Sequence, residues 1–306
     1  MWNRLKFRLI LILLAMAGLA IYWFVSQKPV GYTDRRQVLT TTIEQENELG
    51  LQAYAQILSQ EGENVVCSGN ASSCSSLERE ILERVQAIGE DLRLAAIAYE
   101  DELIASGEPV EPKARDFEWT FNVIQSDQPN AFCLPGGYVA IYTGILDVTG
   151  NFDGEVTVED VVDLDKLAVM MGHEIAHALA RHGGERMSQG KILQVGQIAV
   201  GVAGGDQRIM EAFGLAAQTG VLLPFSRQHE AEADKIGLEL LVRACYDPRE
   251  APELWERMGT LGQGQKPPEF LSTHPSSERR AENFREWMPD AVSEYVARGC
   301  PALSGR

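Results

Sequence analysis

The chain has 306 residues, of which 45% are hydrophobic and 23% charged, and its formal net charge is −17. This composition is typical of a folded globular protein, and the length allows one large core or two small domains. The acidic balance, without a basic stripe, argues against nucleic-acid binding, which needs clustered Lys and Arg.

The N-terminus has the pattern of a membrane anchor. Arg4, Lys6 and Arg8 precede an uncharged run from Leu9 to Val25, about 17 residues and near the minimum for a spanning helix. Positive charge before the run predicts a short N-terminus inside the cytoplasm and the bulk of the chain outside it. We therefore expect an anchor over residues 1–28 and a folded domain over residues 29–306. A cleaved signal peptide, releasing a soluble exported domain, is the alternative.

The remainder predicts a mainly α-helical α+β protein with a small sheet. Strands are expected over residues 118–124 and 138–142, separated by a turn that contains Pro135-Gly136-Gly137. Apolar residues at spacings of three and four, with breakers between them, predict the helices. These helices cover residues 41–58, 77–100, 164–182, 227–244, 251–258 and 276–287.

Five cysteines fit an oxidising compartment. Cys67 and Cys74 flank a Ser/Gly/Asn-rich loop, and Cys245 with Cys300 would tie down the C-terminus. Cys133 is then left over, as a small buried apolar residue. Spacing alone does not determine the connectivity.

The strongest chemical signal is His173-Glu174-Ile175-Ala176-His177, inside the helix predicted over residues 164–182. Two histidines four residues apart lie about 40° apart around a helix, so both rings can reach one metal ion. The glutamate beside the first histidine then faces a metal-bound water. The pattern predicts a zinc-dependent peptidase.

A third ligand has to come from elsewhere in the chain. His182 lies five residues after His177, about 140° around a continuous helix, and is expected to be a supporting or surface histidine. Glu230 and Asp234 are four apart on one face of a later helix. One can bind zinc while the other accepts a hydrogen bond from a ligating histidine. Glu232 is expected to point away from Asp234, and His229 is expected to be peripheral to the site.

These residues resemble the M48 metallopeptidase family, which includes HtpX-type, BepA-type and prenyl-protein-processing enzymes. The resemblance spans about Thr41 to Met288 and is greatest to bacterial periplasmic members and their mitochondrial relatives. It rests on several ordered stretches: Met171 to His182, Glu185 to Ser188, Asn130 to Gly137, Ser226 to Asp234, Thr273-His274-Pro275 and Glu278-Arg279-Arg280.

The resemblance implies a zincin-like domain with a small sheet next to the zinc helix and one Zn²⁺ per chain. It implies zinc ligands at His173, His177 and Glu230, and catalytic groups at Glu174, Asp234 and His274. His274 is similar to a histidine that stabilises the oxyanion or caps the zinc. The stretch Asn130 to Gly137 is similar to an edge strand that pairs with an extended polypeptide substrate.

The implied function is endopeptidase cleavage of misfolded or misassembled envelope proteins, by a single-pass enzyme of the bacterial inner membrane whose catalytic domain is periplasmic. A membrane-tethered, chaperone-like protein that uses the same cleft with little proteolysis is the alternative. Two further segments each allow two interpretations. Residues 187–221 are a lid or a span, and residues 149–160 are an acidic insertion or a calcium loop.

Overall fold

In the computed structural model, the chain is described over residues 17–68, 74–150, 163–202, 223–261 and 278–303. Six single residues outside or between these ranges are described as well, at positions 10, 14, 211, 214, 270 and 274. Residues 151–160 of the segment interpreted as an acidic insertion or a calcium loop, and most of the second half of the segment interpreted as a lid or a span, lie outside the described residues.

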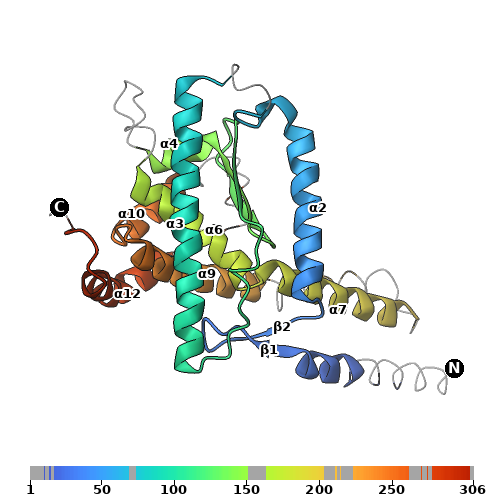
Figure 1. Cartoon of the computed structure of the whole chain (residues 1–306). Coiled ribbons are helices and arrows are strands. Elements are labelled where there is room, and N and C mark those ends of the chain that lie inside the picture. The colour runs from blue at the N-terminus through green and yellow to red at the C-terminus, as the bar shows by residue number, and fades with distance from the viewer. Residues whose placement is uncertain are drawn as a thin grey trace.

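A three-stranded sheet lies between two long helices. Its order is β3 (Thr120–Ile124), β5 (Tyr138–Tyr142) and β4 (Ala131–Leu134), with β3 parallel and β4 antiparallel to β5. Figure 1 shows this sheet between α2 (Ile43–Glu61) and α3 (Ser76–Ser106). The two predicted strands are present. The third, β4, lies in the stretch that the family resemblance implied as an edge strand.

The predicted helices form, with shifted ends. Capping boxes at Thr42 with Gln45 and at Ser75 with Glu78 start α2 and α3, because each pair satisfies backbone N–H groups that have no helical partner. The remaining helices are the following: α4 (Leu146–Thr149), α6 (Leu164–Leu179), α7 (His182–Val202), α9 (Leu223–Ala244), α10 (Glu250–Leu261) and α12 (Glu278–Ala297).

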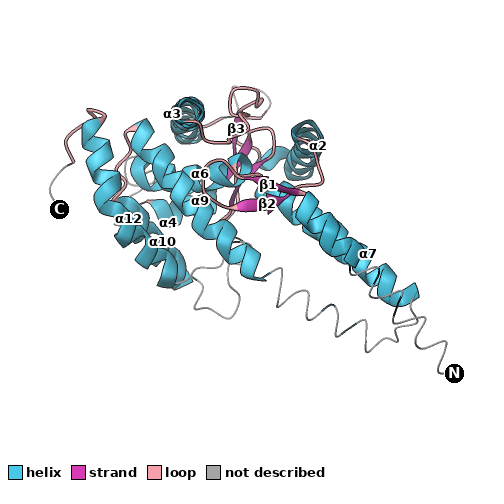
Figure 2. Ribbon diagram, turned by 90° about the horizontal axis from the view of Figure 1, so that it is seen from below, coloured by secondary structure: helices cyan, strands magenta, loops and turns pink. Residues whose placement is uncertain are grey.

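Helices α6 and α9 form the centre of the main core. Leu167 and Met170 of α6 and Ile236 and Leu240 of α9 are fully buried. Figure 2 shows α10 and α12 on the side of this pair away from α2, while β4 packs directly on α6. The arrangement confirms a mainly helical fold with a small sheet next to the helix that carries the two histidines.

The N-terminal part continues into a small hairpin. Residues 17–25 are helical, and β1 (Gln27–Pro29) pairs antiparallel with β2 (Arg36–Val38), so the boundary predicted at residue 28 falls within β1. The helical residues run beside α7, away from the body of the molecule (Figure 1). Over the part of the chain that is described, no helix combines the length and the apolar character that a membrane span requires.

The helix predicted over residues 164–182 is in fact two helices. It ends at Leu179, and α7 begins at His182 after a turn in which Arg181 has a positive φ of 59°. This conformation is uncommon for a residue other than glycine. It is held here because the buried Arg181 guanidinium binds both carboxylate oxygens of Glu46 and the carbonyl of Thr41.

Both predicted disulfides are present, Cys67–Cys74 and Cys245–Cys300, and Cys133 is a free buried thiol. The second bond joins the end of α9 to the segment after α12. It therefore fixes the last helix against the core.

Candidate metal centre

Helix α6 presents His173, Glu174 and His177 to the interior of the molecule. Asp163 caps its first turn by accepting from the Lys166 backbone N–H, which starts the helix ahead of its apolar stretch. His173 and Glu174 are almost fully buried, and Glu174 and His177 both line a cleft. The 3.6-residue period therefore places the three side chains as the sequence predicted.

Glycines allow α9 to approach α6 closely at this point. A Cβ on Gly237 would stand 3.1 Å from the backbone nitrogen of His173, and one on Gly172 would stand 3.4 Å from the Gly237 carbonyl oxygen. This contact brings Glu230 and Asp234 of α9 beside the two histidines. Gly237 is a feature that sequence reasoning missed, although it follows Asp234 by only three residues.

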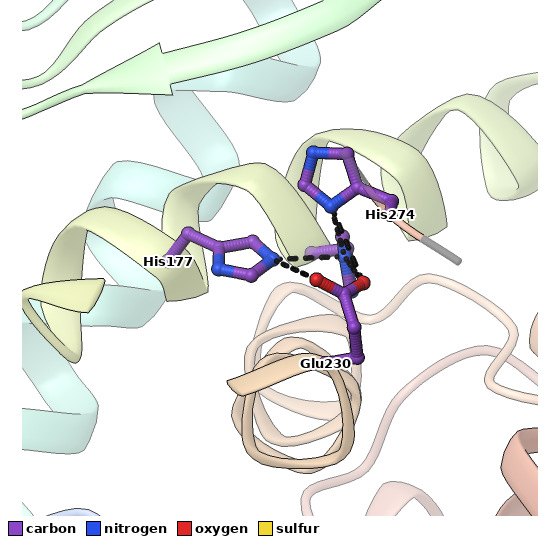
Figure 3. A group of neighbouring side chains, drawn as sticks. His177, Glu230 and His274 are labelled. Atoms are coloured by element: carbon purple, nitrogen blue, oxygen red, sulfur yellow. Dashed lines mark hydrogen bonds and ion pairs between the residues drawn. The ribbon is translucent and has the colours of Figure 1, made fainter. Parts of the chain in front are cut away.

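Four side chains from three parts of the chain converge on one point. His173, His177, Glu230 and His274 each direct one donor atom there, and these atoms all lie within 4.8 Å of one another. Figure 3 shows His177 and His274 pointing at the Glu230 carboxylate. The Nε2 atoms of the two α6 histidines are 3.1 Å apart, and His274 Nδ1 is 3.2 Å from Glu230 Oε2.

The donor set fits a divalent metal such as zinc. Two or three imidazoles and one carboxylate are ordinary zinc ligands, and a tetrahedral site with bonds of 2.0–2.1 Å separates its ligand atoms by about 3.3 Å. The separations here include 3.4 Å from His173 Nε2 to Glu230 Oε2 and 3.6 Å from His177 Nε2 to Glu230 Oε1. Glu230 Oε1 is buried and has no hydrogen-bond partner among the described residues, so an acceptor is available there.

The electrostatics of the centre favour a bound cation. Burial would raise the pKa of Glu230, but hydrogen bonds from His173 and His274 hold that pKa well below its usual range. Burial lowers the pKa of His173, yet Asp234 and Glu230 outweigh it and raise that pKa to about 9. Two carboxylates therefore stabilise positive charge at this point of a buried site.

Glu174 lies beside the cluster rather than in it. Its Oε1 is 3.8 Å from His274 Nε2 and has no hydrogen-bond partner among the described residues. Burial raises the pKa of Glu174, with His274 acting in the opposite direction. A carboxylate with a raised pKa is suited to take up and release a proton.

Asp234 supports His173 from behind. Its Oδ1 is 3.0 Å from His173 Nδ1, so that the histidine donates there and keeps Nε2 for the cluster. Arg280 of α12 binds both Asp234 oxygens at 2.6 and 2.7 Å and lies over the ring of Trp255. The sequence had assigned Arg280 no role, because nothing local distinguishes it from the exposed Arg279 next to it.

Two further histidines lie behind the cluster. His182 was expected to be a supporting or surface histidine, and it supports His177, but by a different geometry: the helix is not continuous, and the turn at Arg181 brings His182 Nδ1 to 2.7 Å from His177 Nδ1. His229 was expected to be peripheral. It is buried, contacts Glu185 at 2.8 Å and stacks on the His182 ring. Glu232 points away from Asp234, as predicted, and contacts His182 and Arg35.

A cleft of 360 Å³ opens over the cluster. Its apolar wall is formed by Ile57 of α2 and by Phe132, Leu134 and Pro135 at and after β4, while Glu174 and His177 form its floor. Among the described strands, β4 pairs only with β5, so its other edge is open beside this cleft.

Residues 101–288 match the family described as peptidase family M48. The chain belongs to this family. The match covers more than half of the chain and includes all six predicted site residues, and it confirms the enzyme class predicted from the sequence, a metalloendopeptidase.

Relatives of this family member occur in mitochondria and in bacteria. The chain is 32% identical to mitochondrial metalloendopeptidase OMA1 of Schizosaccharomyces pombe, over 93% of the chain and 73% of the relative. It is 36% identical to OMA1 of Saccharomyces cerevisiae, over 61% of the chain and 52% of the relative. It is 30% identical to the beta-barrel assembly-enhancing protease of Escherichia coli, over 54% of the chain and 33% of the relative.

Proposed function

We propose that the chain is a zinc-dependent endopeptidase that cleaves misfolded or misassembled proteins of the cell envelope. The observation that carries the proposal is the convergence of His173, His177 and Glu230 beside the buried Glu174 carboxylate, at the floor of a cleft. Zinc held by those three residues would supply Lewis-acid chemistry, since it acidifies bound water and polarises a carbonyl.

The residues of the chain then divide the proton transfers. Glu174 accepts the proton of the attacking water and later delivers it to the leaving amine. His274 has Nδ1 within the donor cluster and Nε2 toward Glu174. We assign it to cap the metal position in the resting enzyme and to donate a hydrogen bond to the oxyanion during the reaction. Asp234 keeps His173 in the tautomer in which Nδ1 carries the proton and Nε2 is unprotonated.

The substrate is proposed to be an extended polypeptide segment. The open edge of β4 offers backbone groups to such a segment, and the apolar wall of the cleft offers contacts for its side chains. Unfolded proteins expose unpaired backbone groups and apolar side chains that can make these contacts, whereas folded proteins bury them. The E. coli relative is named for enhancing β-barrel assembly, which supports an envelope-protein substrate for this chain too.

We also propose that residues 1–28 anchor the enzyme in the bacterial inner membrane and that residues 29–306 form the periplasmic catalytic domain. Support comes from the positive charges before the apolar run and from two disulfides, which persist in oxidising compartments. Alkaline phosphatase fused after residue 306 is active only if the domain is exported.

The decisive experiment is cleavage of an unfolded protein such as casein by the purified chain. We expect cleavage that a zinc chelator blocks, and loss of cleavage in Glu174→Gln with metal content still near one zinc per chain. Binding of casein without cleavage in the wild type would favour the chaperone-like alternative. Cleavage retained after zinc is removed would contradict the zinc mechanism.

A further inference from the structure

The ring nitrogen of His177 that faces away from the donor cluster has a partner of its own. His177 Nδ1 lies 2.7 Å from His182 Nδ1, and His182 Nε2 lies 2.9 Å from Glu232 Oε2. Two N–H groups cannot face each other at 2.7 Å, so one of the Nδ1 atoms carries the proton and the other accepts it. The contacts of Glu232 decide which one.

The Glu232 carboxyl group accepts hydrogen bonds from donors that lie around its two oxygens. Arg35 places Nε and Nη2 at 2.8 and 2.7 Å from Glu232 Oε2, and the Thr33 hydroxyl donates to Oε1. His182 Nε2 must therefore carry a proton. In a neutral ring, His182 Nδ1 is then the acceptor, and His177 must donate from Nδ1. This leaves the lone pair of His177 Nε2 directed at the cluster.

We propose that Arg35, Glu232 and His182 are positioning residues for the metal ligand His177. The relay they form sets the tautomer and ring orientation of His177, just as Arg280 and Asp234 do for His173. The inference rests on the proposed metal site, because the unprotonated Nε2 of His177 has a function only if it binds a metal ion. Partners that orient a ligating histidine commonly change metal affinity about 10–100-fold.

The relay connects the metal centre to the N-terminal hairpin. Arg35 directly precedes β2 and also binds Glu185 of α7 at 2.7 Å, while Glu185 accepts from the Val38 backbone N–H. His182, Glu185 and Glu232 are all buried. Burying so many polar groups costs free energy unless each is paired. Here Glu232 accepts hydrogen bonds from Arg35 on one side and from His182 on the other, and His182 in turn accepts from His177.

Two substitutions of His182 distinguish an effect on the orientation of His177 from an effect on packing. His182→Phe keeps the stacking on His229 but removes the acceptor for His177 Nδ1. His182→Asn places an amide oxygen near the same point. With Zn²⁺ in competition with a chromophoric chelator, we expect His182→Phe to bind zinc about 10–100-fold more weakly, and His182→Asn to recover much of that loss.

Arg35→Met tests the far end of the relay, because it leaves every histidine in place. We expect about a tenfold weaker zinc affinity and a changed absorption spectrum of the Co²⁺-loaded protein. Arg243→Met is the matched control, since Arg243 has a side chain that is only 6% exposed and pairs with Glu102 and Glu239, and its ion pairs among the described residues include no histidine. Its zinc affinity and Co²⁺ spectrum should equal those of the wild type.

The outcomes distinguish this inference from the proposed function. If the wild type binds neither Zn²⁺ nor Co²⁺, the proposed metal site itself fails. If the wild type binds zinc and His182→Phe binds it equally well, the metal site stands and the relay is overturned. Equal losses in His182→Phe and His182→Asn would also overturn it, because a packing defect does not depend on the acceptor.

Discussion

Gly237 of α9 lies against the backbone of His173 in α6, so closely that a Cβ at position 237 would stand 3.1 Å from the His173 nitrogen. The same Cβ would be 3.2 Å from the Gly172 carbonyl carbon. The distance between the two helices that carry the candidate ligands is thus limited by a residue without a side chain. A crowded backbone contact cannot be relieved by rotating a side chain.

Gly237→Ala is therefore expected to push α6 and α9 apart by a few tenths of an ångström. We expect a loss of about 1–3 kcal/mol in the free energy of unfolding, as for other overpacked sites, together with weaker zinc binding. Gly172→Ala is the control, because its Cβ would make only an ordinary contact at 3.4 Å. Equal zinc affinities of the Gly237→Ala variant and the wild type would show that the helix spacing does not set the metal geometry.

Arg280→Met should destabilise the metal-free protein by about 3 kcal/mol, because it leaves the buried Asp234 carboxylate without its cation. Arg280→Lys should recover only part of the loss, since an ammonium group cannot bind both oxygens in the same plane. Added Zn²⁺ should narrow the difference, because it returns positive charge beside Glu230. Urea unfolding of the wild type and the variants, once with EDTA and once with zinc, measures these differences in the free energy of unfolding. A loss of stability that is the same with EDTA and with zinc would contradict the prediction.

Lys113 predicts a pH dependence of stability away from the metal centre. Burial lowers the pKa of its ammonium group to about 8, despite Glu100 at 3.8 Å. The unfolded chain, with a lysine pKa of about 10.4, binds more protons than the folded one between pH 8 and 10.4. The contribution of this group to the free energy of unfolding therefore rises with pH across that window.

Lys113→Met removes the contribution. Between pH 7.5 and pH 10 the wild type should therefore gain about 2 kcal/mol in its free energy of unfolding relative to the variant. Denaturant unfolding of both proteins at these two pH values measures the difference, and the titration of tyrosines that do not contact Lys113 cancels. Parallel stability curves would contradict the prediction.

The Cys245–Cys300 bond joins residues 55 apart in the sequence, so it restricts the unfolded chain strongly. Replacing both cysteines with serine should cost up to about 4 kcal/mol of stability by the chain-entropy estimate. The Cys67–Cys74 bond, with a separation of 7, should contribute about 2 kcal/mol on the same estimate.

Zinc affinity should change little in the Cys245 and Cys300 variant at temperatures where it is folded. Cys245 lies about 20 Å along α9 from Glu230, at the other end of the helix. Thermal unfolding and chelator competition on the two double variants test both statements. A large loss of zinc affinity in the folded protein would show that the bond reaches the metal centre.

Local periodicity was enough to predict the elements that carry the chemistry. The spacing of His173 and His177 and of Glu230 and Asp234 follows from 3.6 residues per turn, and each pair does lie on one helix face. The three-residue strand pairing of the hairpin was not predicted, since such short strands have no periodic pattern. The break at Arg181 was missed because a left-handed arginine depends on partners far away in the sequence, above all Glu46.

By itself, the sequence predicted the enzyme class, most of the helices and the residues of the candidate metal centre, and it offered the two disulfide pairs without determining them. Only the tertiary structure decided which groups stand behind the candidate ligands. Arg35, Arg280 and His229 have no local signal, because their partners are 197, 46 and 44 residues away in the sequence. The His173-Glu174-Ile175-Ala176-His177 motif places the donor atoms along one helix. The packing of α9, α12 and the N-terminal hairpin around it decides how each ring is turned, because hydrogen bonds between distant segments form only when the chain has folded.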